Sequence, residues 1–254
     1  MSGRLILPLL AVFAVSGCAS SQTWGWYVID PRTEQGQRNL DFLTDGLLTT
    51  ITLSITAAAI SVILGLLVAL PALSERRSYR IGNRVYVEFV RCIPLLPMLI
   101  WAFYGLPVVL EAMGLKVRFD PYWTAVLTIA ISDSAFTAEI FRAGIQSIGK
   151  GQTEAAQTVG LNYRQTMQYV VLPQAVRRIL PPLANQFVYV LKMSALASVI
   201  GVQELMRRAN ELVTQEYRAL EIYTFLILEY FLLVLIISAA VRWLERRMGS
   251  DERG

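Results

Sequence analysis

The feature that most constrains this chain is a run of 29 residues, 46–74, that contains no charged side chain. A second run, 222–241, contains a single charge, Glu229. A helix needs about 20 apolar residues to cross the hydrocarbon core of a bilayer, where each backbone polar group must be satisfied within its own segment. Buried helices of soluble proteins rarely lack charge over such a length. We therefore expect a helical membrane protein. The composition agrees, since 55% of residues are hydrophobic and 17% charged, against roughly 45–50% and about 25% in soluble domains.

Several other functions are excluded by what the chain lacks. It contains no histidine, so a His-based catalytic or zinc site cannot form. Cys18 and Cys92 are its two cysteines, and they provide neither a disulfide framework nor a metal-ligand spacing. The net charge of +4 needs no nucleic acid partner, because Lys and Arg gather on the cytoplasmic side of membrane proteins. No phosphate-binding loop ending in Gly-Lys-Ser or Gly-Lys-Thr occurs, so the chain is not expected to hydrolyse ATP itself, and we expect no cofactor.

Five membrane spans are predicted, at about residues 46–72, 85–107, 121–146, 178–200 and 221–243. Twelve Lys and Arg residues then lie on the side of the C-terminus, and seven lie on the opposite side. Positive charge is concentrated in the cytoplasm, so the C-terminus and the connection after the third span are expected there. Segment 21–41 is then periplasmic, 201–219 contributes a short helix at the outer face, and 248–254 forms a cytoplasmic tail.

The first 20 residues allow three interpretations. Arg4 precedes a short apolar run, which ends in Val-Ser-Gly-Cys at Cys18. This pattern is typical of a cleaved secretory signal. It is also similar to a bacterial lipoprotein signal, which would leave a lipidated Cys18 as the first residue. The third interpretation is an extra N-terminal helix or a start codon placed too early.

A polar stretch between the third and fourth spans, 150–173, differs from its surroundings. Residues 152–159 have helical composition, and Gly160 is expected to end that helix by supplying a flexible or left-handed position. Asn162 can cap a second helix, with Gln165 completing a capping box. Pro173 is expected to close this second helix. The stretch therefore predicts a helix–turn–helix elbow on the cytoplasmic face.

One side of the elbow's second helix is apolar, because Tyr163, Met167 and Val170 follow one another at helical spacing. Such a stripe can rest on lipid. It can equally insert into a groove of a cytoplasmic partner, which better explains why the connection is longer than two spans require.

The elbow resembles a known motif. Glu154-Ala155-Ala156, Gly160 and Val170-Val171-Leu172-Pro173 resemble the EAA loop of bacterial ABC importer permeases. Five further sequences are similar to the polar-amino-acid permease family, over about 42–247: GLLTTITLS (46–54), RCIPLL (91–96), AEIFRAGIQSI (138–148), LPQAVRRILPPLANQFV (172–188) and LASVIGVQEL (196–205).

The resemblance implies an all-α integral membrane protein of the bacterial inner membrane: a five-span ABC importer permease core with a cytoplasmic EAA elbow. It implies that two permeases, identical or similar, form the path for an amino acid. A separate ABC ATPase dimer would dock on the elbows, and a periplasmic solute-binding protein would deliver the solute. The residues that it assigns to ATPase coupling are Glu154, Ala155, Ala156, Gly160, Tyr163, Met167 and Pro173.

Alternative functions remain at this stage. The same architecture could import an opine or another amino-acid derivative. A secondary transporter or channel that works alone would need no ATPase elbow. A purely structural anchor is disfavoured, because ionisable groups inside spans cost at least about 2.5–3.5 kcal/mol each and usually serve a function.

The ionisable groups within the spans are therefore candidate functional residues. Glu139 and Arg142 lie three residues apart on one helical face and are expected to form a structural ion pair. The candidates for contact with the solute are Arg91, Asp133, Ser134, Lys192 and Ser194.

Three departures from the family pattern bear on these candidates. Cys92-Ile93 replaces the common Gly-Thr after Arg91. Asp133 stands where the family commonly has Ser, and Met193 stands where it has Asp. A carboxylate has in effect moved from the fourth span to the third. Asp133 and Lys192, at similar expected depths, are therefore expected to pair, either permanently or until Lys192 receives the solute's carboxylate and Asp133 its ammonium group.

Overall fold

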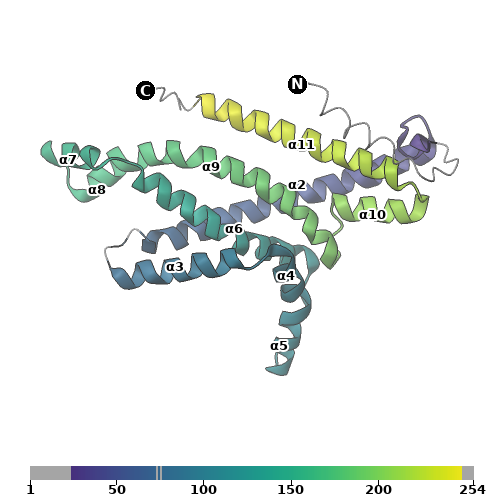
Figure 1. Ribbon diagram of the computed structural model, residues 1–254, viewed down its shortest axis with the longest axis horizontal. Helices are drawn as coiled ribbons and strands as arrows, with labels where there is room; N and C mark the ends of the chain where they lie inside the picture. Colours follow the sequence, from purple (N-terminus) through teal and green to yellow (C-terminus); the bar gives the residue numbers. More distant parts are fainter. Residues whose placement is uncertain (1–23, 73, 75, 248–254) are drawn as a thin grey trace, which may run out of the picture.

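The computed structural model describes residues 24–72, 74 and 76–247, and every regular element within these ranges is a helix (Figure 1). The interpretations of residues 1–20 and of the tail 248–254 lie outside the described residues. The elements in chain order are η1 (Trp26–Ile29), α2 (Glu34–Ala72), α3 (Arg77–Cys92), α4 (Leu95–Ile100), the π-helical turn η2 (Trp101–Gly105), α5 (Leu106–Ala112), α6 (Pro121–Gln146), α7 (Lys150–Thr158), α8 (Tyr163–Thr166), a second π-helical turn η3 (Met167–Val171), α9 (Leu172–Met193), η4 (Ser194–Ile200), α10 (Leu205–Glu216) and α11 (Ala219–Arg247).

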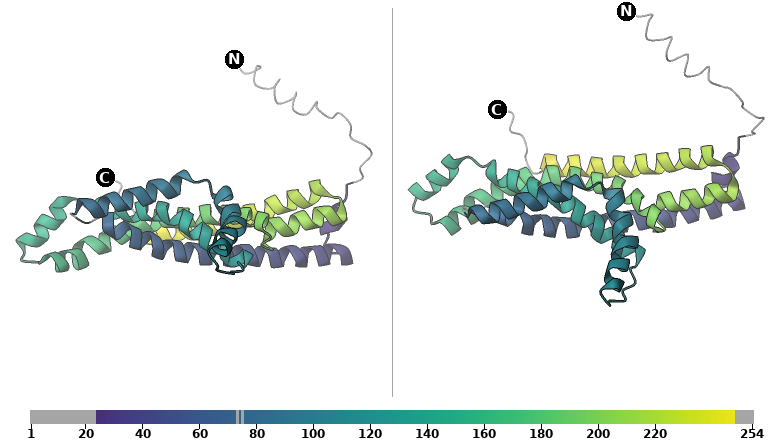
Figure 2. Two further views of the ribbon diagram at one scale, coloured as in Figure 1. Left: turned by 90° about the horizontal axis from the view of Figure 1, so that it is seen from below. Right: turned by 60° about the horizontal axis from the view of Figure 1, so that its bottom comes forward.

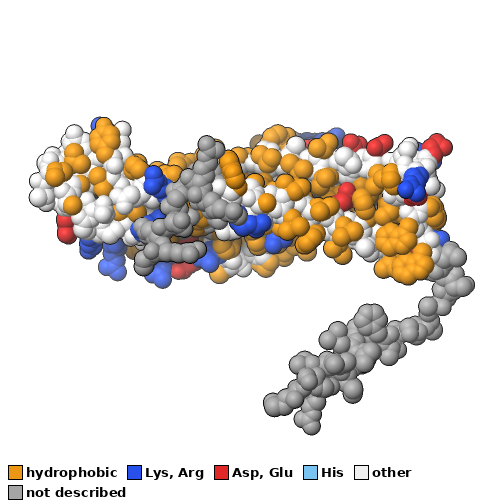
Figure 3. Space-filling model, turned by 90° about the horizontal axis from the view of Figure 1, so that it is seen from above, with side chains coloured by type: hydrophobic (Ala, Val, Ile, Leu, Met, Phe, Trp, Pro, Cys, Tyr) orange, Lys and Arg blue, Asp and Glu red, His pale blue; other side chains and the backbone are white. Residues whose placement is uncertain are grey.

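The molecule is an elongated bundle. α2, α3, α6, α9 and α11 run along its length, α7 and α8 lie at one end, and α10 lies toward the other (Figures 1 and 2). The segment from α4 to α5 projects sideways from the bundle. Hydrophobic side chains cover much of the middle of the face drawn in Figure 3, as expected for a surface in contact with lipid.

Five described helices are long and apolar enough to cross a membrane, as predicted: Glu34–Ala72, Leu95–Ala112, Pro121–Gln146, Tyr163–Ile200 and Ala219–Trp243. The bounds of the third agree with the prediction. The second was placed too early, because the chain leaves helical geometry at Ile93 and Pro94, and the apolar helix begins only at Leu95. The preceding α3 is a separate amphipathic helix.

α2 and α6 approach each other closely along a row of small residues. Ala57, Ser61, Gly65 and Ala69 recur at every fourth position of α2 and are all buried. A Cβ atom on Gly65 would lie 2.6 Å from Cγ2 of Thr137 on α6, so a larger residue here would require the two helices to move apart. Small residues at such spacing allow membrane helices to pack backbone against backbone.

A buried carboxylate links the three central helices. Asp133 of α6 is 5% exposed. Its Oδ2 accepts hydrogen bonds from Ser61 of α2 at 2.5 Å and from Thr137 at 3.2 Å, and its Oδ1 accepts one from Gln186 of α9 at 2.5 Å. We call these four residues the Asp133 clasp. All three donors are neutral side chains.

A second buried carboxylate lies between α2, α10 and α11. Glu204 is fully buried and accepts hydrogen bonds from the backbone N–H groups of Met206 and Arg207, which caps α10. Its Oε2 also accepts from the hydroxyls of Tyr230 on α11, at 3.0 Å, and Thr50 on α2, at 3.4 Å. Burial raises the pKa of the Glu204 carboxyl from 4.5 to about 7, since desolvation disfavours the charged form.

We predict that Asp133→Ala lowers stability by on the order of 2–4 kcal/mol, because the buried hydroxyl groups of Ser61 and Thr137 and the half-buried amide of Gln186 lose their shared acceptor. Asp133→Asn should cost less, since its amide can donate to Ser61 or Thr137 while its oxygen still accepts from Gln186. Thermal unfolding in detergent measures both changes. Asp41→Ala, which removes an exposed carboxylate of α2, is the control, and equal melting temperatures for the two alanine variants would contradict the role of the clasp.

We predict that apparent thermal stability falls as pH rises from about 4.5 through about 7. The folded state binds the Glu204 proton more tightly than the unfolded state, so the stabilisation is complete below pH 4.5 and is lost above the folded pKa. The shift corresponds to about 3 kcal/mol at most. In Glu204→Gln this part of the pH dependence should be absent. Parallel melting-temperature curves for the two proteins between pH 4.5 and 8 would show that another group is responsible.

Candidate functional site

The elbow forms as the sequence predicts. α7 ends before Gly160, whose φ of +85° is the left-handed conformation that favours glycine. Asn162 then caps α8 with a complete capping box: its side chain accepts from the backbone N–H of Gln165, and the side chain of Gln165 accepts from the backbone N–H of Asn162, both at 3.0 Å. The pair α7–α8 lies at one end of the molecule (Figure 1).

Pro173 does not close the second helix, and this expectation is wrong. α8 passes through the π-helical turn η3 into α9, so that 163–200 is one continuous helix with Pro173 in the first turn of α9. A proline inside a helix removes one backbone donor and crowds the carbonyl four residues earlier. The wider π-helical turn before Pro173 accommodates both effects.

The elbow residues divide into an outward and an inward set. Glu154, Ala155 and Tyr163 are exposed, and Tyr163 reaches 73%. Ala156 is buried, and Met167 packs against an apolar cluster at the base of the elbow.

Sequence reasoning missed Val159 and Tyr169, which are 76% and 65% exposed. Val159 directly precedes the turn glycine and Tyr169 lies in η3. An apolar residue next to a turn was a usable signal, whereas the outward direction of Tyr169 depends on the π-helical turn.

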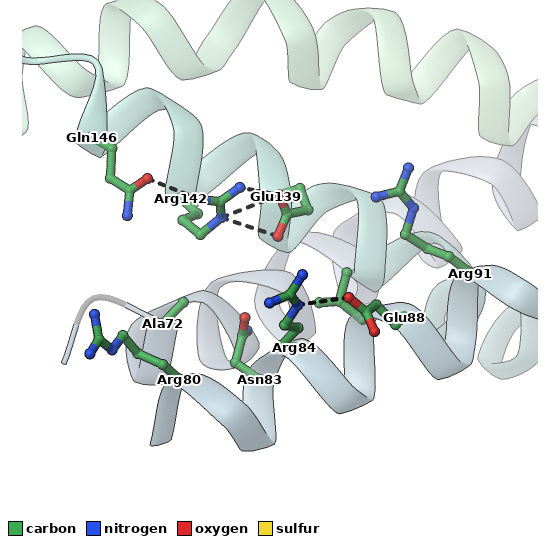
Figure 4. Close-up of a pocket in the computed structure, with 10 residues that line it drawn as sticks. Ala72, Arg80, Asn83, Arg84, Glu88, Arg91, Glu139, Arg142 and Gln146 are labelled. Atoms are coloured by element: carbon green, nitrogen blue, oxygen red, sulfur yellow. Dashed lines mark hydrogen bonds and ion pairs between the residues drawn. The ribbon is translucent and has the colours of Figure 1, made fainter. Parts of the chain in front are cut away.

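A charged groove lies between α3 and α6, with a cavity of about 490 Å³ (Figure 4). We call it the arginine groove. It is lined by Arg80, Arg84 and Arg91 from α3 and by Glu139, Arg142 and Gln146 from α6, together with Ala72, Asn83, Val87 and Glu88.

Two ion pairs lie within the arginine groove. Arg142 and Glu139 form the pair that the sequence predicts, at 2.5 Å, and Arg142 also donates to Gln146 at 2.9 Å. Arg84 pairs with Glu88 at 2.8 Å.

Arg91 has a different environment. Its guanidinium lies 4.9 Å from the ring centroid of Phe136 on α6, within range of a cation–π contact. Neither Arg91 nor Arg80 forms an ion pair with a residue that the structure describes.

Asp133 and Lys192 form no ion pair, which corrects that expectation. Asp133 is held in its clasp, whereas Lys192 is exposed beside Tyr230 and Phe231 of α11. Gln186 contacts Asp133, and six further residues turn the helix by about 240°, so Lys192 points away. The expectation compared depth in the membrane but not direction around the helix axis.

The two candidate serines are buried within the bundle. Ser134 donates to the carbonyl of Ile131 and also contacts the hydroxyl of Tyr86 at 2.8 Å. Ser194 donates to the carbonyl of Leu191. Both hydroxyls are thus used within the fold. Across the described part of the chain, no group of three or more Cys, Asp or Glu residues is arranged to hold a metal ion.

Comparison with known proteins shows which family the chain resembles in sequence. The family of binding-protein-dependent transport system inner membrane components matches residues 61–250. A probable glutamine ABC transporter permease protein of Bacillus subtilis, GlnM, is 35% identical over 210 residues, which cover 83% of this chain and 94% of that protein. The glutamine transport system permease protein GlnP of Escherichia coli is 40% identical over 164 residues, 65% of this chain and 73% of that protein.

A solved structure supports the same family assignment. The crystal structure of an amino acid ABC transporter with histidines contains a chain that is 34% identical, with a TM-score of 0.79. The match covers 89% of this chain and 100% of that one. With its five spans, its elbow and these relatives, the chain belongs to the family of binding-protein-dependent transport system inner membrane components.

Proposed function

We propose that this chain is the transmembrane permease subunit of an ATP-driven importer for polar amino acids. The observation that carries the proposal is the elbow: an exposed helix–turn–helix with outward-facing Glu154 and Tyr163, at one end of a membrane-spanning bundle. Relatives at 35–40% identity are permease proteins of glutamine transport systems, which supports an amino acid as the solute.

The energy source is a separate ATPase dimer that docks on the elbow. The apolar side chains of Val159, Tyr163 and Tyr169 project from it, and an exposed apolar surface at the end of a helix pair suits a partner's groove. Closure of the ATPases would then move α9, which continues from the elbow without a break, and so alternate the access of the path.

Two further partners complete the importer. A second permease chain, identical or similar, would pack on the lateral surface, where Trp101, Tyr104 and Val108 of the α4–α5 segment are exposed. A periplasmic binding protein would deliver the solute to the opposite end from the elbow. The N-terminal part of α2 then faces the periplasm, and the elbow and the C-terminus face the cytoplasm.

We predict that Gly160→Val weakens ATPase docking while the protein still inserts in the membrane. Gly160 has open space around it and a positive φ, so the substitution acts only through the backbone, at a cost of about 1–2 kcal/mol. Gly151→Val is the matched control, since it also has open space but no positive φ. Co-purification of the ATPase and solute-stimulated ATP hydrolysis measure docking. Equal results for the two variants would contradict the proposal.

The orientation gives a further prediction, testable with single cysteines in a background without Cys18 and Cys92. Gln37→Cys, near the start of α2, should react with a membrane-impermeant thiol reagent in intact spheroplasts. Lys150→Cys, at the elbow, should react only after permeabilisation. Both side chains are exposed, so access to the reagent alone decides the result, and the reverse pattern would invert the topology.

A further inference from the structure

α3 differs from the spanning helices in carrying a row of cations. Arg80, Arg84 and Arg91 lie within about 40° of one another around the helix, because four and eleven residues are close to one and three full turns. All three side chains line the arginine groove opposite α6 (Figure 4). A different face of α3 exposes the apolar residues Val85 and Phe89. The helix therefore has one side suited to lipid and another that is not.

The row extends along most of α3, and its three side chains are exposed. Arg91 lies 14 residues after Arg77, the first residue of α3, which corresponds to about 21 Å along the helix. A guanidinium that faces lipid costs at least about 2.5–3.5 kcal/mol, so these side chains are expected to face away from it. The arginine groove must therefore contain water or a ligand of opposite charge.

The charges inside the arginine groove do not balance. Four arginines face two glutamates there, which leaves a formal net charge of +2. Glu88 and Glu139 are paired with Arg84 and Arg142. Within the described part of the chain, Arg91 has a cation–π contact with Phe136 and no ion pair, so its N–H donors stay available. A guanidinium presents its donors in a planar fork that fits a carboxylate.

The lining favours a small solute over a lipid. Among its ten residues only Ala72 and Val87 are apolar, which suits a polar solute better than acyl chains. Glu88 and Glu139 are close enough to the row to interact with an ammonium group. The cavity of about 490 Å³ admits an amino acid with part of its hydration shell.

From these observations we infer that the arginine groove binds the solute's carboxylate groups on the inner half of its path, and that it favours amino acids of neutral or negative net charge over cationic ones. The inference rests on the proposed function, since it takes the arginine groove as part of that path. Arg91 and Arg80 are about 16 Å apart along α3, too far for one small molecule. They therefore act as two successive carboxylate positions, within a positive field that repels a dibasic solute.

The test measures binding to the purified full-length permease in neutral detergent, by equilibrium dialysis with radiolabelled glutamate, glutamine and lysine. The wild type should bind glutamate most tightly and lysine least. Arg91→Gln and Arg80→Gln should each weaken glutamate binding at least tenfold and bring the glutamate and lysine affinities closer together. Arg38→Gln is the matched control: it removes one arginine from an exposed pair with Glu34, outside the arginine groove, and should change nothing.

The side chains of Arg80 and Arg91 are both exposed, so each variant tests the inference with little effect on folding. The inference is overturned if none of the amino acids binds, if lysine binds as tightly as glutamate, or if the control lowers affinity as much as the arginine-groove variants. Phosphatidylglycerol that is retained by the wild type and lost from the variants, without amino-acid binding, would assign the site to a lipid headgroup and equally overturn it. No ATPase is present in this assay, so a negative result counts against the arginine groove as a binding site and says nothing about docking of the ATPase on the elbow.

Discussion

The bundle depends on the contact between α2 and α6, with the Asp133 clasp at its centre. In lipid, apolar surface gives little preference for one helix pairing over another, because lipid tails are as apolar as leucine. The row of small residues from Ala57 to Ala69 lets the two backbones meet, and the clasp then fixes their register, because a one-turn slip would leave a carboxylate and three donors unsatisfied. α9 is tied to the same point through Gln186. The helices that carry the elbow and the arginine groove are thereby positioned by one group.

Features set by neighbouring residues could be predicted from the sequence. Long apolar runs with at most one charge identified the first and last spans. The spacing of Gly160, Asn162 and Gln165 predicted the elbow, since a turn glycine and a capping box are determined within a few residues. The pair Glu139–Arg142 is also local. Features set by packing could not be predicted. The separation of Asp133 from Lys192 depends on how α9 is rotated against α6, and the π-helical turn lets the helix continue through Pro173 where a proline usually ends one.

The arginine groove could be predicted in part, because its arginines follow a local spacing while its cavity depends on packing. The spacing of Arg80, Arg84 and Arg91 is visible in the sequence, but in a membrane protein such arginines first indicate which end is cytoplasmic. The cavity also requires α6 to lie opposite these arginines, and their spacing in the sequence does not predict this. Arg91 alone suggested a functional residue, because it lies among apolar neighbours beside Pro94, where a charge needs another explanation.

The continuity of residues 163–200 has a mechanical consequence. A hinge between elbow and span would let α8 swivel without disturbing the bundle, whereas a continuous helix passes the movement of one end on to the other, although its π-helical turn and Pro181 and Pro182 are places where it can bend. From Tyr163 to Gln186 this helix is about 35 Å long at 1.5 Å per residue, and Gln186 is hydrogen-bonded to Asp133. A sideways load on the α8 end therefore acts as a torque about the bundle's centre, and the hydrogen bond from Gln186 to Asp133 carries part of it.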